Sequence, residues 1–207
     1  MVTELTLSLI KDLNPKNWIS TYKKTSIKYL CLMFLFYHGL GIIASLIGAS
    51  IIENTIEDYQ DPSLSNSLIP VIMAGPIEES LFFGIPFYLF GNNFVPLAGG
   101  IIWGMLHIFN TNTIELNQLD YANWLFVIPS IFFSLRTWIS RKGWFAIIAH
   151  SVWNVVFFSL SCYSAEIICS LDFNKQDITT ILLSAILLTI TWLLVKRMRN
   201  RKLLNNV

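Results

Sequence analysis

Two adjacent glutamates, Glu78 and Glu79, interrupt an apolar run that extends from Leu68 to Phe90. A carboxylate at the centre of a bilayer costs about 2.5–3.5 kcal/mol on insertion scales, so we expect both groups to face protein or a water-filled cavity. Neighbouring residues of a helix point about 100° apart, so the pair would line a wedge rather than a single stripe. Gly75 and Pro76 come just before the pair and loosen the helix. The alternative is that the pair only hydrogen-bonds neighbouring helices and shapes the bundle.

A histidine lies in the next apolar run, GGIIWGMLHIFN. Gly100 and Gly104 form a small-xxx-small pair, which lets two helices approach closely. His107 follows Gly104 by three residues and Trp103 by four, so it shares a face with this seam. A single intramembrane histidine is more often packed and hydrogen-bonded than catalytic, so this motif decides nothing by itself.

A third motif, AHSVWNVVF, contains His150 and Asn154. The two residues are four apart and lie on one face of a helix. Such a pair either bonds across helices or takes part in catalysis, and the spacing alone favours neither.

The three motifs supply complementary chemistry if they share one cavity. A glutamate beside a histidine can deprotonate water, a histidine can donate to a developing oxyanion, and an asparagine can orient the histidine or hold the oxyanion. The candidate catalytic residues are Glu78, Glu79, His107, His150 and Asn154. The set also offers enough ligands for one zinc ion, with Glu79, His107 and His150 as the candidates. Either arrangement suits hydrolysis of an amide bond within a membrane.

The composition places these motifs in a membrane protein. The 207 residues suffice for one domain, 54% are hydrophobic and only 13% are charged, against about 25% charged in a soluble domain. The net charge of +1 points to no particular partner. Cys31, Cys162 and Cys169 lack metal-ligand spacing and, like His38, are expected to pack in apolar surroundings.

Six apolar runs are long enough, or nearly so, to cross a hydrocarbon core of about 30 Å as helices. They are Ile27–Ile52, Leu68–Phe90, Phe94–Asn110, Ala122–Ile139, Trp144–Ser164 and Ile178–Val195. The third is short and rich in glycine, which suggests that it is tilted or packed inside the bundle.

The distribution of charge predicts the orientation. Lysine and arginine favour the cytoplasmic side of the membrane. With the N-terminus inside, only Lys175 among the basic residues falls in a predicted outside loop, 53–67, 111–121 or 165–177. We therefore predict an N-in, C-in topology.

Simple residue counting leaves a geometric question. It puts the glutamate pair near mid-membrane, His107 toward the outside and His150 toward the inside. Straight helices would keep these residues apart. Helix tilts, a break of the second span near Pro76 or a displaced third span would bring them together.

The segments GPIEESLFFG, WGMLH and AHSVWN resemble, in order and spacing, the motifs of the CAAX prenyl protease and bacteriocin-processing family, also called CPBP or Abi. The pattern of that family is EExxxR, then FxxxH, then HxxxN or HxxxD, and the resemblance covers about residues 70–160. It implies an intramembrane endopeptidase of glutamate or metallo type. The implied substrates are prenylated CAAX tails, bacteriocin-type leader peptides or membrane-bound signalling peptides.

One position departs from the family pattern, because Phe83 stands where the motif has arginine. Its loss removes a cation that could pair with a glutamate or position a substrate carbonyl. Arg136 is a candidate substitute, although snorkelling at a span end explains it more simply. The alternative function is therefore a non-catalytic family-like protein in bacteriocin immunity, scaffolding or regulation. A proton-coupled transporter is a third option, but no inverted repeat is visible.

The sequence thus predicts an all-α, polytopic membrane helical bundle of about six transmembrane helices. A single domain, 27–195, would follow a cytoplasmic or interfacial segment, 1–26, and precede a basic cytoplasmic tail, 196–207. We expect an integral protein of a prokaryotic plasma membrane whose partners are the bilayer and a membrane-associated peptide or prenylated protein. The run Lys196–Lys202 suits anionic lipid rather than nucleic acid, since no aromatic residues are interleaved.

Overall fold

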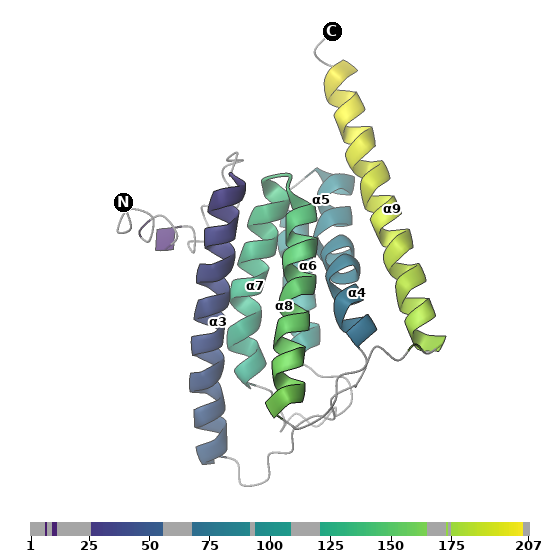
Figure 1. Cartoon of the computed structure of the whole chain (residues 1–207). Coiled ribbons are helices and arrows are strands. Elements are labelled where there is room, and N and C mark those ends of the chain that lie inside the picture. The colour runs from purple at the N-terminus through teal and green to yellow at the C-terminus, as the bar shows by residue number, and fades with distance from the viewer. Residues whose placement is uncertain are drawn as a thin grey trace.

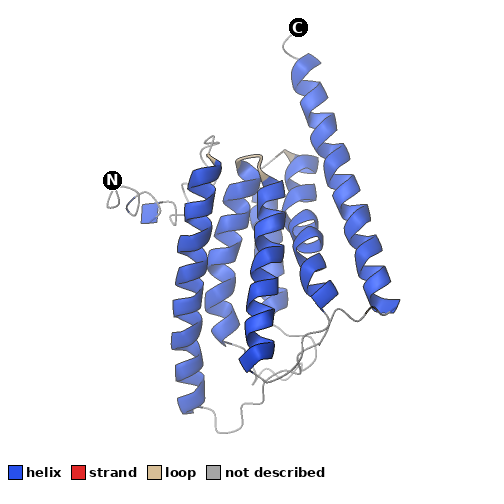
Figure 2. Ribbon diagram, viewed as in Figure 1, coloured by secondary structure: helices blue, strands red, loops and turns tan. Residues whose placement is uncertain are grey.

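The computed structural model describes residues 7, 10–11, 26–55, 68–91, 94–108, 121–164, 173 and 175–204. Every secondary-structure element in these ranges is helical, which confirms the all-α prediction, and the helices run side by side in one bundle (Figures 1 and 2). In chain order they are α3 (Ile27–Thr55), α4 (Leu68–Glu78), the π-helix η1 (Glu79–Gly84), α5 (Ile85–Phe90), α6 (Phe94–Ile108), α7 (Tyr121–Ile139), α8 (Gly143–Ser164) and α9 (Lys175–Leu204). Most of the segment 1–26 and of the predicted outside loops lies outside the described residues.

The predicted spans coincide with these helices, and α4, η1 and α5 together form the second. Only the sixth prediction, Ile178–Val195, misses an end by more than three residues, because α9 continues to Leu204. A helix of this length reaches roughly 45 Å and so exceeds the hydrocarbon core, and lysine and arginine are good helix formers in the part beyond it. No break in the helix separates the predicted domain from the basic tail.

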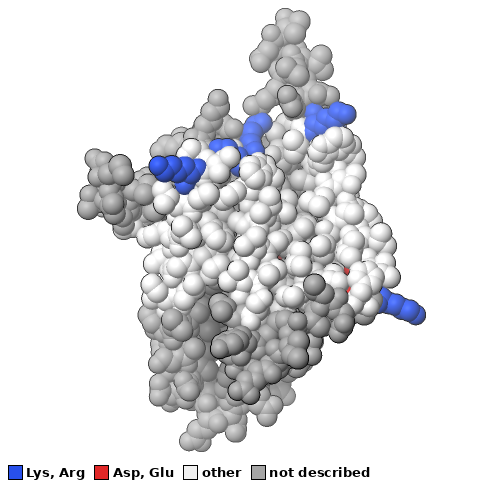
Figure 3. Space-filling view, in the orientation of Figure 1, with Lys and Arg blue, Asp and Glu red and all other residues white. Residues whose placement is uncertain are grey.

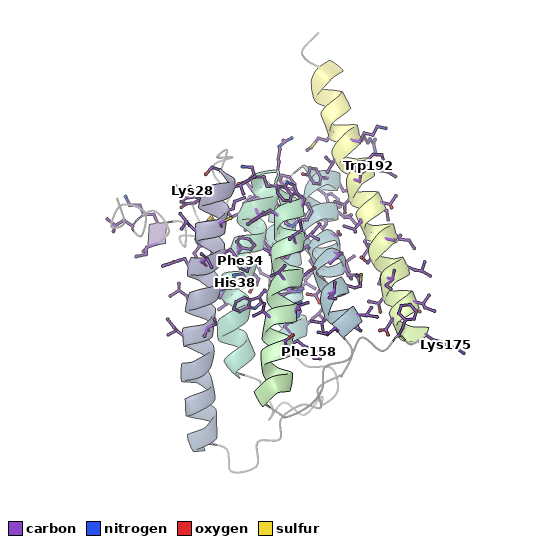
Figure 4. All side chains as sticks on the ribbon, in the orientation of Figure 1. Lys28, Phe34, His38, Phe158, Lys175 and Trp192 are labelled. Carbon is purple, nitrogen blue, oxygen red and sulfur yellow. The ribbon has the colours of Figure 1, made fainter. Side chains whose placement is uncertain are left out.

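Two helical stretches among the described residues, Leu68–Phe90 and Asp177–Met198, are long and apolar enough to cross a membrane. The stretches Ile27–Leu40, Phe94–His107 and Gly143–Val156 are apolar but shorter. Lys and Arg gather at the end of the bundle past which α9 extends, and Lys175 lies at the opposite end (Figures 3 and 4). This segregation is the one that the topology prediction requires, whereas the count of six spans and the N-in, C-in orientation stay predictions.

The second half of α7 lies at the centre of the bundle. Residues 133–140 are all buried, while α3 packs along α7, α4 along α8, and α6 against both α7 and η1. α9 packs on α4 and α5, and its other side carries exposed apolar residues such as Trp192 (Figure 4). An apolar surface of this kind suits contact with lipid.

A serine on α8 compensates for the proline inside α4. Pro76 has no N–H, so the carbonyl of Ile72, four residues earlier, loses its helical partner. The hydroxyl of Ser151 donates to that carbonyl at 2.8 Å. The close approach depends on Gly75, where an added Cβ would lie 2.3 Å from the Ser151 hydroxyl oxygen. The seam between α4 and α8 thus supplies what the proline removes.

The π-helix begins at the second glutamate. Its wider turn is closed by the N–H of Ile85, which donates to the carbonyl of Ser80. π-Helical turns inside α-helices are frequent at functional sites. Pro86 has no N–H to donate to the Phe82 carbonyl four residues earlier, and α6 approaches that carbonyl so closely at Gly99 that a Cβ would lie 1.9 Å from its oxygen. Glycine is therefore required there.

Replacing Ser151 by alanine should lower the free energy of unfolding by about 1–3 kcal/mol, because it leaves the carbonyl of half-buried Ile72 without its hydrogen-bond donor. In a Pro76→Ala background the cost should fall, since residue 76 regains an N–H. Thermal melting of the wild type, both single variants and the double variant in detergent measures this cycle. Ser159→Ala, an exposed position on the same helix, is the matched control. If Ser151→Ala lowered the free energy of unfolding equally in both backgrounds, Ser151 would not be compensating for Pro76.

Candidate active site

Glu79 is a fully buried carboxylate that three side chains satisfy. Its Oε1 accepts hydrogen bonds from the Ser134 hydroxyl at 2.5 Å and from Nδ1 of His150 at 3.2 Å. Its Oε2 accepts from the indole N–H of Trp138 at 2.6 Å. Only 1% of the side chain is exposed, so these contacts replace the hydration that burial removes.

Ser134 and Trp138 were not among the predicted site residues. They lie four residues apart on α7 and so share one helix face. The Trp138 ring lies against Gly84 and Gly143, where an added Cβ would come within 2.5 Å and 2.1 Å of its atoms. The available signal was the segment FSLRTW, in which a polar residue and an indole recur at helical spacing inside an apolar run.

Glu78, the last residue of α4, faces a different set of helices. Its Oε2 accepts the indole N–H of Trp103 at 2.5 Å, and it lies 3.8 Å from Nε2 of His107 and 3.6 Å from Nε2 of His150. Both imidazole separations exceed a hydrogen bond of about 2.9 Å. The adjacent glutamates thus share His150 but otherwise face different helices, α6 for Glu78 and α7 for Glu79, as the predicted wedge requires.

The two histidines have the same hydrogen-bonding pattern at Nδ1. His107 donates from Nδ1 to the backbone carbonyl of Trp103 at 2.9 Å. His150 uses Nδ1 toward the carboxylate of Glu79. Each acceptor requires a proton on Nδ1, so a neutral ring presents the Nε2 lone pair toward Glu78 and a protonated ring presents a second donor there.

Exposure rises across the site from one carboxylate to the other. The side chains of Glu79 and His150 are 1% and 14% exposed, whereas those of Glu78 and His107 are 23% and 39% exposed. Glu78 and His107 therefore form the more exposed side of this group, while Glu79 lies behind them.

The depth difference expected from residue counting does not keep the motifs apart. Glu78 on α4 has side-chain neighbours on both α6 and α8. Asn154 is half-buried one turn beyond His150, and its amide makes no hydrogen bond to another residue that the structure describes. Arg136, proposed to snorkel from a span end, lies in the last turn of α7 but is buried there.

His38 lies outside this group and has the packing role expected of it. Its Nδ1 donates to the Phe34 carbonyl at 3.0 Å on its own helix, and its ring lies 4.7 Å from that of Trp153 and 5.6 Å from that of Phe133 (Figure 4). The residue helps to pack α3 against α7 and α8.

The contacts do not fit the predicted zinc set of Glu79, His107 and His150. Both oxygens of Glu79 accept hydrogen bonds from protein groups, and Nδ1 of each histidine is engaged. Within the described part of the chain, no group of three or more His, Cys, Asp or Glu side chains is arranged to hold a metal ion. Zinc stays a prediction from the sequence, and no step below involves it.

Residues 60–156 match the family model described as type II CAAX prenyl endopeptidase, Rce1-like. The matched range contains the five candidate catalytic residues together with Phe83 and Trp103. No curated protein and no solved structure matches the chain.

Replacing Trp138 by phenylalanine should lower the free energy of unfolding by about 1–3 kcal/mol, because the Oε2 atom of Glu79 loses its donor while most of the ring packing remains. Thermal melting in detergent measures the loss. Trp144→Phe, at a 53% exposed position, controls for removal of an indole and should melt like the wild type. Identical melting of both variants would show that the bond to Glu79 contributes nothing.

Proposed function

Residues 60–156 belong to the Rce1-like family of CAAX proteases, and on that premise we propose that the chain is an intramembrane endopeptidase that uses Glu78 as its general base. The observation that carries the proposal is the approach of one partly exposed carboxylate to Nε2 of two histidines from different helices. A membrane-associated peptide is the substrate class that the family implies. Prenylated CAAX tails and leader-type peptides are the specific candidates.

Glu78 has one oxygen available for proton transfer. Its Oε2 is held by Trp103, whereas Oε1 has no hydrogen bond to another described residue. In the proposed step, Glu78 takes a proton from water while the water oxygen attacks the peptide carbonyl carbon. Collapse of the tetrahedral intermediate breaks the C–N bond, and the proton on Glu78 passes to the leaving amine. The products are one carboxylic acid and one amine, which balances the reaction.

The developing oxyanion needs donors near the attacked carbonyl. Asn154 offers an amide that is not committed to another described side chain, and His107 offers Nε2–H when its ring is protonated. A donor of this kind contributes about 10²–10³-fold to kcat in hydrolases. We assign both residues to this role.

Glu79 is too buried to touch a substrate and has a different role. It accepts from Nδ1 of His150 and so fixes the orientation and tautomer of that ring. An imidazole held this way keeps Nε2 facing Glu78, 3.6 Å from the Oε2 atom that Trp103 also holds. Glu79 is thus a positioning residue, and its partners Ser134 and Trp138 hold it in place.

The alternative is a non-catalytic membrane protein in bacteriocin immunity, scaffolding or regulation. The observation that favours it is Phe83, which is 2% exposed and cannot supply the charge of the motif arginine. Such a protein would retain the bundle and its polar interior for folding or for binding a partner, and it would tolerate loss of Glu78.

Glu78→Gln keeps the size and one hydrogen-bond acceptor of the side chain but removes the base. We expect a loss of at least about 10²-fold in cleavage, the lower range for general-base catalysis. Purified full-length protein in liposomes would be incubated with a prenylated CAAX peptide and, separately, with a leader-peptide library, and the products identified by mass spectrometry.

Leu81→Ala, at a 46% exposed position on η1, is the control and should cleave like the wild type. Wild-type activity in Glu78→Gln would refute the base assignment. Absence of cleavage by the wild type on both substrates would favour the non-catalytic alternative.

Cleavage should persist after treatment with a strong chelator, because both histidines and Glu79 engage protein groups. The measurement is the initial rate before and after chelation and after addition of zinc. Loss of activity on chelation with recovery on zinc would instead support a metalloprotease, and the hydrogen bonds of Glu79 and His150 would then have to rearrange.

A further inference from the structure

The indole of Trp103 contacts each side chain in the exposed part of the site. Its N–H donates to Oε2 of Glu78. Its ring lies 4.3 Å from the ring of His107 and 5.9 Å, edge to face, from that of His150. Trp103 is itself 5% exposed, so this ring is fixed within the bundle rather than at its surface.

Phe83 holds Trp103 from the side of η1. The two rings meet edge to face at 6.4 Å, and Phe83 is almost completely buried. It packs directly on the backbone of α6 at Gly100, where a Cβ would lie 2.8 Å from the Phe83 ring. The position that departs from the motif is therefore in contact with the aromatic position of the second motif.

Both positions differ from the motif in complementary ways. The motif has arginine at position 83 and phenylalanine at position 103, whereas this chain has phenylalanine and tryptophan. A phenyl ring cannot donate a hydrogen bond, while an indole donates one in the plane of its ring. The chain has lost a charged donor on η1 and gained a neutral donor on α6, and the gained donor is bonded to Glu78.

We propose that Trp103 is a positioning residue for Glu78 and that Phe83 and Trp103 act as a coupled pair in place of the motif arginine. The indole orients the carboxylate without pairing its charge with a cation. Phe83 packs beside the indole in a space where a guanidinium would be buried. The catalytic part of this inference rests on the proposed function, whereas the coupling of the two positions does not.

The test uses the full-length protein with Trp103→Phe, Phe83→Arg and the double variant, assayed in liposomes with the cleaved peptide. Trp103→Phe should lower kcat roughly 10- to 100-fold, as expected for loss of a hydrogen bond to a charged group, and change KM less than about twofold. The double variant has the motif residues at both positions, and its kcat should be at least about tenfold higher than that of Trp103→Phe. Trp144→Phe is the matched control and should retain wild-type kcat.

Wild-type kcat in Trp103→Phe would overturn the positioning role, and so would a double variant no more active than Trp103→Phe. In either case Glu78→Gln still decides the proposed function by itself. A KM increase without a change in kcat would assign Trp103 to substrate binding and also overturn the proposal.

Thermal melting of the wild type, both single variants and the double variant tests the coupling without a substrate. Phe83→Arg alone should melt far below the wild type, because it buries a guanidinium beside the indole. The double variant should melt at least about 4 °C above Phe83→Arg, since the smaller ring makes room for the longer side chain. Additive shifts would show that the positions are independent and would refute the pair, even in a protein that cleaves no peptide.

Discussion

The fully buried carboxylate of Glu79 is the constraint around which the bundle is organised. A charge of this kind in an apolar interior is stable only if protein groups replace its water. Ser134, Trp138 and His150 do so from two other helices. Because donors on α7 and α8 must reach one point on η1, these three elements have a fixed relative position.

Small residues and a change of helix type make that convergence sterically feasible. Trp138 can lie across η1 and the start of α8 because Gly84 and Gly143 leave room for its ring. Gly75 brings α4 against α8, where Ser151 replaces the hydrogen bond that Pro76 removes. The wider π-helical turn then starts at Glu79, so the carboxylate pair straddles the junction between two helix types.

The two glutamates are adjacent in sequence but differ in environment. Glu79 is enclosed by donors and fixes His150, whereas Glu78 is partly exposed and faces Nε2 of both histidines. In the proposed mechanism, Glu79 orients the His150 ring and Glu78 exchanges protons. The aromatic pair of Trp103 and Phe83, where the chain departs from the family motif, adjoins Glu78 and both histidines through the Trp103 indole.

The sequence by itself determined the helices, the polar motifs and the resemblance to a protease family. Apolar runs and their polar interruptions are local properties, so the bounds of most helices and the wedge formed by Glu78 and Glu79 followed from spacing. Residue counting did not show that His107 and His150 meet at Glu78, because it assumes that the helices are straight and lie at the same depth in the membrane. Only the tertiary structure identified Ser134, Trp138 and the donor role of Trp103, since a serine hydroxyl or an indole N–H becomes part of a site only when another helix brings a carboxylate within about 3 Å of it.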